Sequence, residues 1–189
     1  MPEFKVAVHS SIGDIAADEW DRLAGDDFPV LRHAFLSAAE ETGCVSETSG
    51  WQPRHLALLE DGRLRAAMPL YEKTHSWGEF VFDWAWADAY RRAGLPYYPK
   101  LVSAIPFTPA PSKRLLLADD DDVDAAAALV RGATLLAGES GCSSVHVLFP
   151  LERELAMFEE LGLKLRKDCQ FHWHNQGYGT FDDFLETFS

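Results

Sequence analysis

The sequence contains few cysteines and no closely spaced pair of them. Cys44, Cys142 and Cys169 are the only three among 189 residues, and they stand far apart without a CxxC pair. An odd and scattered set of this kind excludes a disulfide framework and a zinc finger. It indicates a protein of the reducing cytoplasm.

Basic residues and long apolar runs are scarce as well. Lys and Arg number 17 against 30 Asp and Glu, which gives a net charge of −13. We therefore expect no strong binding of nucleic acid by this chain. No segment approaches the ~20 apolar residues that span a bilayer, and the start of the chain does not resemble a signal peptide. The sequence predicts one globular domain, residues 1–189, without a membrane span.

Apolar residues make up 47% of the chain and aromatic residues 12%, enough for a buried core. The clearest local signal is a β-hairpin over residues 55–71, with Asp61-Gly62 as a preferred type I′ turn. Helical spacing of apolar residues, with Asp, Gly or Pro at the ends, predicts helices at 15–24 (capped by Asp14), 32–42, 123–137 and from Pro150 to 161. Short β-rich runs predict strands at 4–8, 101–105, 114–117, 145–149 and 163–173. This alternation is typical of an α/β fold with a mixed sheet.

Aromatic residues are concentrated between Trp77 and Tyr98. Phe80, Phe82, Trp84 and Trp86 share one parity, so an extended segment would present their four rings on one face. Such rings usually fill a core strand. The polar residues interleaved with them also fit the wall of a ligand pocket. These polar residues are His75, Glu79, Asp83 and Asp88.

Two further motifs could carry chemistry, and each has a simpler explanation. His172 and His174 would lie on one side of a strand, but no third ligand stands nearby, so we predict no metal site. Ser144 stands close to His146 without the glycines of a nucleophile elbow, which makes a serine hydrolase a weak hypothesis. Cys142 has no activating neighbour and is expected to be inert.

Long blocks of the sequence resemble a bacterial family of peptidoglycan biosynthesis or recognition proteins related to the Fem-type aminoacyltransferases. The blocks are His75-Ser76 with Gly78-Glu79, Val81 to Tyr90, Tyr97 to Leu101, Pro106 to Pro109 and Arg114 to Leu116. The resemblance implies a fold like that of the acyl-CoA N-acyltransferases (GNAT), with a mixed, mostly antiparallel central sheet flanked by helices. It also implies a longer protein of two such domains in tandem. We expect this chain to be the N-terminal half and the missing C-terminal domain to be its partner.

The segment before the 123–137 helix does not suit a coenzyme. A glycine-rich turn at a helix N-terminus would bind the phosphates of coenzyme A. Residues 113–122 contain no glycine, and Asp119 to Asp122 would repel a pyrophosphate. Phe158 stands where acetyltransferases often carry a tyrosine that serves as general acid, and a phenyl ring donates no proton. We therefore expect no cofactor in this half, whereas the full-length protein would use acyl-CoA or aminoacyl-tRNA.

The resemblance implies transfer of an acyl or aminoacyl group to an amine, for which a cell-wall precursor or another small molecule is the expected acceptor. Asp83 or His75 is expected to orient or deprotonate the amine, and Trp84 and Trp86 to stack on the acceptor. Lys100 is expected to meet an anionic group. Other candidates for substrate binding are Asp88, Tyr90 and Thr108. The alternative is a degenerate domain that recognises cell-wall fragments or supports a catalytic partner domain without catalysis of its own.

Overall fold

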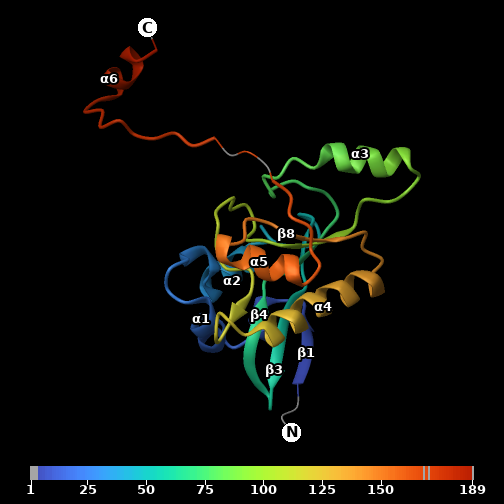
Figure 1. Cartoon of the computed structure of the whole chain (residues 1–189). Coiled ribbons are helices and arrows are strands. Elements are labelled where there is room, and N and C mark those ends of the chain that lie inside the picture. The colour runs from blue at the N-terminus through green and yellow to red at the C-terminus, as the bar shows by residue number, and fades with distance from the viewer. Residues whose placement is uncertain (1–3, 168, 170, 189) are drawn as a thin grey trace.

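The computed structural model describes residues 4–167, 169 and 171–188 and shows an α/β fold with two four-stranded sheets (Figure 1). The first sheet has the order β1 (Phe4–His9), β3 (His55–Glu60), β4 (Arg63–Met68), β7 (Leu116–Leu117). The second has the order β2 (Trp51–Pro53), β5 (Tyr71–Lys73), β6 (Lys100–Ser103), β8 (Val145–Val147). The described strand pairs are antiparallel apart from β6 and β8, which run parallel. The predicted mixed, mostly antiparallel sheet is confirmed.

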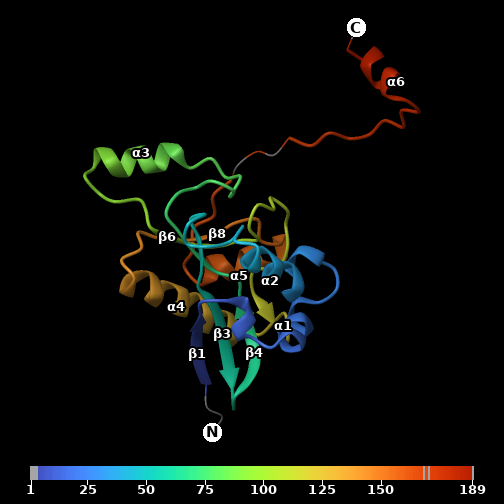
Figure 2. The same ribbon diagram turned by 180° about the vertical axis from the view of Figure 1, so that it is seen from behind.

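Helices cover both faces of the first sheet (Figures 1 and 2). On one face, α4 (Val123–Glu139) and α5 (Glu152–Glu160) enclose a core that includes Leu56, Leu129 and Phe158. On the other, α1 (Ala17–Ala24) and α2 (His33–Glu41) enclose a second core around Trp20 and Leu36. Two short 3-10 helices, η1 (Ile12–Asp14) and η2 (Pro29–Leu31), flank α1. No helix in the described ranges is long and apolar enough to cross a bilayer.

Two long chain segments run through both sheets. A single residue, Arg54, separates β2 from β3, and Pro69-Leu70 separate β4 from β5. The predicted hairpin is confirmed, because β3 and β4 pair and both turn residues have positive φ, 48° at Asp61 and 80° at Gly62. The segments β2–β3 and β4–β5 therefore each contribute one strand to the first sheet and one to the second.

The helix predictions hold with small changes at the ends. The predicted cap Asp14 instead belongs to η1, and α1 begins after Ala16, which makes no side-chain cap. Asp122 does cap α4, because its Oδ1 accepts a hydrogen bond from the amide of Ala125 at 3.0 Å. In the tail, α6 (Phe181–Glu186) is capped by Thr180.

Residues 80–86 do not form the extended segment that would present four rings on one face, because a helix, α3 (Trp84–Arg92), begins at Trp84. Alternate alanines favour the helix, and two arginines at its C-terminus complement the helix dipole. The chain then turns at Gly94, where φ is +71°. Helical spacing places Trp84 and Trp86 on different sides of α3, so the four rings share no face.

The predicted strand at 163–173 is also absent from the residues that the structure describes there, and Asp168 and Gln170 lie outside them. After α5 the chain leaves the body as an extended tail that ends in α6 (Figure 1). A strand needs a neighbour, and β8 stays at the edge of its sheet. The same edge position leaves β8 half-buried.

Candidate functional site

The site is built on a long segment, residues 74–99, that connects two neighbouring antiparallel strands, β5 and β6. Such a connection usually needs about 2–5 residues, and longer loops are most often functional. Segment 74–99 contains α3, which stands apart from the body and has no buried residue (Figures 1 and 2). The fold alone therefore does not require this segment.

Two buried lysines lie at the base of the segment. Lys73 of β5 and Lys100 of β6 stand directly opposite each other in the sheet, and their side chains are 0% and 1% exposed. Like charges facing each other across two strands destabilise a sheet, and burial without partners costs more. The sheet therefore needs counter-charges at this point.

Segment 74–99 supplies those charges to Lys100. Its Nζ lies 2.8 Å from Oε2 of Glu79, 2.5 Å from Oδ2 of Asp83 and 3.0 Å from Oγ of Ser76. These three hydrogen bonds use all three protons of the ammonium group. The hydroxyl of Tyr97 donates a further bond of 2.7 Å to Oδ2 of Asp83. We call these residues, together with Lys73, the ion cluster.

Lys73 is held differently, without a direct ion pair. Its Nζ donates to the carbonyl oxygen of Trp77 at 3.1 Å and lies 3.7 Å from the ring centre of Trp51. Burial lowers the pKa of Lys73 to about 7, and Lys100 adds to the effect while Glu79 opposes it. Lys73 therefore loses its proton near neutral pH.

The two carboxylates of the ion cluster have pKa values that shift in opposite directions. Burial raises the pKa of Glu79 above its usual range, although attraction to Lys100 opposes the rise. For Asp83 burial acts in the same sense, but hydrogen bonds from Lys100 and Tyr97 outweigh it and lower the pKa. Oε1 of Glu79 and Oδ1 of Asp83 are buried and have no hydrogen-bond partner in the structure. The cluster thus has two unsatisfied acceptors.

The aromatic rings of residues 77–86 are exposed, so the core interpretation of these rings is wrong. Trp84 contacts Trp77 and Phe82, with ring centres 6.4 and 5.5 Å apart. These three rings are 60%, 71% and 67% exposed, and Phe80 and Trp86 are each 54% exposed. The rings form an exposed apolar surface on segment 74–99.

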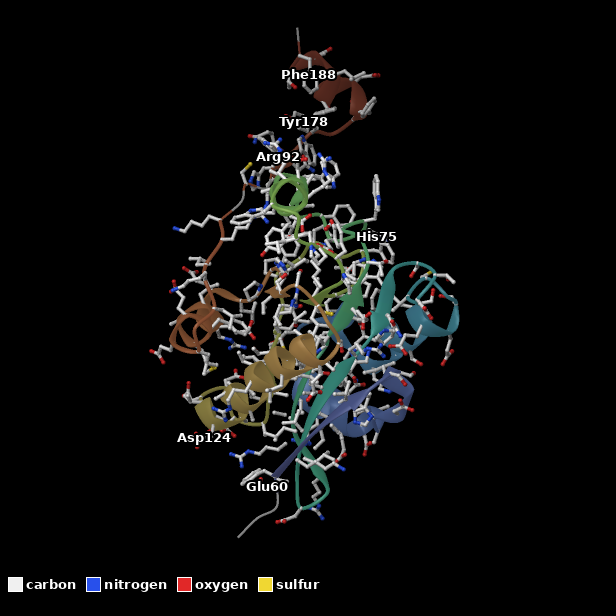
Figure 3. All side chains as sticks on the ribbon, turned by 90° about the vertical axis from the view of Figure 1, so that its right-hand side faces the viewer. Glu60, His75, Arg92, Asp124, Tyr178 and Phe188 are labelled. Carbon is white, nitrogen blue, oxygen red and sulfur yellow. The ribbon has the colours of Figure 1, made fainter. Side chains whose placement is uncertain are left out.

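The structure brings some of the predicted site residues together and keeps others apart. Asp83 and Lys100 meet in the ion cluster, so the anionic groups next to Lys100 belong to the chain itself. His75 is half-buried near its edge, below α3 in Figure 3, and its Nδ1 accepts from the amide of Trp77. Burial lowers the pKa of His75, so its imidazole is neutral at pH 7.

The remaining predicted residues lie outside the ion cluster. Asp88 pairs with Arg91 and Arg92 on the exposed surface of α3. Tyr90 packs against Tyr97 with ring centres 5.1 Å apart. Thr108 lies on the separate segment between β6 and β7, where its hydroxyl donates to the carbonyl oxygen of Pro106.

Sequence reasoning missed Lys73, Ser76 and Tyr97 as parts of the site, and it named Glu79 only as a polar residue of a possible pocket wall. Glu79 and Asp83 stand four residues apart in an aromatic stretch, and this spacing is the signal that could have indicated a shared role. The pairing of Lys73 with Lys100 depends on strand register, for which the local sequence holds no signal.

The other predicted motifs support no chemistry in this arrangement. His146 accepts or donates a 2.8 Å hydrogen bond with the hydroxyl of Ser144, but burial lowers the pKa of His146 to about 4, which makes it a weak base. Burial also raises the pKa of the Cys142 thiol. His172 and His174 stack at 6.3 Å, and within the described ranges no three His, Cys, Asp or Glu side chains are grouped as metal ligands would be.

The N-terminus of α4 is capped by a side chain of the chain itself. Asp122 caps α4 and forms an ion pair with Arg65, with Oδ2 2.7 Å from Nη2. Nearby, the carboxylate of Glu154 accepts hydrogen bonds from the amides of Arg114 and Leu115 at 2.8 and 2.9 Å. The amides of Ala125, Arg114 and Leu115 thus already have acidic partners.

Comparison with known proteins agrees with this fold. A family model, FemAB-like, described as peptidoglycan biosynthesis/recognition, matches residues 11–189. The aminoglycoside 6'-N-acetyltransferase AAC(6')-Ig from Acinetobacter haemolyticus is similar in structure, with a TM-score of 0.53 and 14% identity over 90% of this chain and 98% of that one. The aminoglycoside N-acetyltransferase AAC(6')-Iy, solved with CoA, has a TM-score of 0.56 and 10% identity over 92% and 96% of the two chains. No curated protein matches the sequence.

Proposed function

The chain belongs to the FemAB-like family of peptidoglycan biosynthesis/recognition proteins, and from this premise we propose that it takes part in the transfer of an acyl or aminoacyl group to an amine acceptor. Its acetyltransferase-like fold supports this proposal. A peptidoglycan precursor is the acceptor that the family description favours.

The observation that carries the proposal is the ion cluster beneath exposed rings. Buried carboxylate oxygens of Glu79 and Asp83 without donors suit a group rich in N–H, such as an amine. Exposed aromatic rings, those of Trp84 and Trp86 among them, provide stacking surface for an acceptor and attract a cation. In this reaction the protein would position the two substrates and stabilise the oxyanion.

The donor would bind outside this chain. Asp122 occupies the amide of Ala125 at the N-terminus of α4 and places a negative charge where phosphates would meet the helix, and the net charge of −13 disfavours a tRNA donor. We therefore propose a partner domain that holds the acyl-CoA or aminoacyl-tRNA. The exposed rings of segment 74–99 offer such a domain an apolar contact surface.

We place the reaction in the cytoplasm. Cys44 is exposed and Cys142 is half-buried, and both are free thiols. Such thiols persist in a reducing compartment.

The same observation about Asp122 supports a second candidate function. A chain without a phosphate site could recognise cell-wall fragments, or support a catalytic partner, without catalysing a reaction itself. The exposed rings would then bind the fragment rather than an acceptor for acylation.

A thermal-shift screen of the full-length protein distinguishes the two. We expect the acyl or aminoacyl donor and a precursor analogue each to raise the melting temperature with concentration, because each binds the folded state. In a complementation assay, Asp83→Asn is expected to abolish activity. A response to precursor analogues alone, together with a fully active Asp83→Asn variant, would favour recognition without catalysis.

A further inference from the structure

Glu79 carries a buried carboxylate with one oxygen in use and one oxygen free. Oε2 accepts a hydrogen bond from Lys100 at 2.8 Å, while Oε1 has no partner, and the residue is 3% exposed. A buried acceptor without a donor costs free energy, so its persistence calls for an explanation. A ligand that donates an N–H at this point would provide the missing partner.

The groups around Glu79 make it the stronger base of the two carboxylates. It faces Lys100 of β6, Lys73 of β5, Asp83 and Tyr97. Lys100 and Tyr97 both donate to Asp83, which stabilises its charged form and lowers its pKa. Burial raises the pKa of Glu79, and the negative charge of Asp83 adds to the rise. The single hydrogen bond from Lys100 opposes this rise without cancelling it. Two carboxylates with pKa values shifted in opposite directions take different roles in proton transfer.

We propose that Glu79 is the residue that takes the proton from the acceptor's amine, with Oε1 as the receiving atom. This inference rests on the proposed acyl transfer and assigns its general base. Asp83 then has a positioning role, because its carboxylate holds Lys100 and Tyr97 in place around Glu79.

The proposed reaction moves the acyl group from the donor's oxygen or sulfur to the acceptor's nitrogen. The ammonium group first loses one proton to solvent. The resulting amine nitrogen forms a C–N bond with the acyl carbonyl carbon of an activated ester or thioester, and one N–H proton passes to Oε1 of Glu79. The bond from the carbonyl carbon to the donor's oxygen or sulfur breaks, and the leaving atom keeps the electron pair and takes a proton from solvent. Glu79 returns its proton to solvent when the amide product leaves.

The residues next to Glu79 in the chain lie at the surface of the molecule. In the chain Glu79 stands between Trp77 and Phe80, which are 71% and 54% exposed, and next to Gly78, where φ is +80°. The neighbouring helix α3 has no buried residue, and it contacts the ion cluster through Tyr90, whose ring packs against that of Tyr97. Because Oε1 is buried, access of the amine requires this part of segment 74–99 to shift, and the exposed rings of the segment favour the approach of an ammonium group.

NMR of the full chain with ¹³C-labelled glutamate carboxyls tests binding at Glu79 without any turnover. The signal that disappears in Glu79→Gln belongs to Glu79, and Glu79→Asp provides the same assignment if the glutamine variant does not fold. We expect n-butylammonium chloride to shift this signal saturably and n-butanol, its neutral analogue, to leave it unchanged. No shift, or the same shift with both probes, would overturn the inference.

A kinetic measurement uses the neighbouring Glu72 as a matched control. Glu72 lies on β5 next to Lys73 and pairs with Arg54. With a donor and an amine that the wild-type protein turns over, Glu79→Gln should lower kcat about 10²–10⁴-fold and remove the decline of the rate at low pH. Glu72→Gln should keep the wild-type rate and pH profile.

The two proposals fail in different ways. A protein that transfers no acyl group with any donor contradicts the proposed function, whatever the probe amine does. Acyl transfer that continues at the wild-type rate in Glu79→Gln, or an amine that does not affect the Glu79 signal, contradicts only the assignment of Glu79.

Discussion

At the scale of single residues, Lys100 is the side chain that joins segment 74–99 to the sheet. Its three protons are shared among Glu79, Asp83 and Ser76, and all of its charge is buried. Lys100→Met would leave two carboxylates buried without a counter-charge. We expect a loss of about 3–5 kcal/mol in the free energy of unfolding, measured by urea denaturation.

A lysine in a partly exposed ion pair serves as the control for Lys100. Lys113 lies 3.1 Å from Asp120, whose side chain is 45% exposed. Lys113→Met should lower the free energy of unfolding by about 0–1 kcal/mol. Equal losses in the two variants would mean that the ion cluster does not hold the segment.

Lys73 makes the free energy of unfolding depend on pH. Its pKa is about 7 in the folded protein and 10.5 in the unfolded chain, so between these values the unfolded state binds one proton more. Stability from this residue is therefore complete above pH 10.5 and falls as the pH decreases toward 7. From pH 7 to pH 10 we expect the wild type to gain up to about 1.4 kcal/mol per pH unit relative to Lys73→Met.

The measurement for Lys73 is chemical denaturation at several pH values, with Lys5→Met as the control. Lys5 is an exposed lysine of β1. The free energy of unfolding of Lys5→Met should change with pH in parallel with that of the wild type over the same range. A Lys73→Met curve that is also parallel to the wild type would contradict a deprotonated Lys73.

At the scale of elements, Gly50 ties the start of β2 to segment 74–99. Its φ is +70°, and a Cβ added there would lie 2.3 Å from Nε2 of His75. Gly94, at the end of α3, has φ of +71° and open space around its Cβ position. An alanine at either position would therefore suffer the same backbone strain, but only an alanine at position 50 would clash with a side chain.

Gly50→Ala should be less stable than Gly94→Ala by about 1–3 kcal/mol, because an added methyl group there must displace the imidazole. Thermal melting measures the difference, and the imidazole NMR signals of His75 should move only in Gly50→Ala. Equal melting temperatures and an unmoved His75 would show that the ring is not held against Gly50.

Local chemistry explains which elements could be predicted from the sequence. The hairpin depends on two adjacent residues, Asp61 and Gly62, and α4 on a cap and a run of alanines. Parity suggested a strand at Phe80 to Trp86, but the helix propensity of the alanines prevailed. Asp83 and Lys100 could be chosen by residue type. Their contact could not, because it depends on the register that sets Lys100 opposite Lys73.

At the scale of the whole molecule, the acidic charge opposes a bound coenzyme. Asp119 to Asp122 precede α4, and Asp122 already caps its N-terminus. We expect isothermal titration of acetyl-CoA into this chain to show no micromolar binding, because the phosphates would meet like charge where they need free amides. An acetyltransferase that binds CoA is the positive control for the titration. Micromolar affinity for this chain would overturn the charge argument.

The pairing of two lysines at the base of segment 74–99 also has a consequence for how such a protein can change over generations. The segment enters and leaves the fold at facing positions, Lys73 and Lys100, so its removal would leave an ordinary hairpin with two buried lysines and no carboxylate beside them. The segment and the lysines must therefore be gained or lost together. A descendant that dispenses with this chemistry should carry a short turn and apolar residues at both positions, whereas one that keeps either lysine should keep the carboxylates as well.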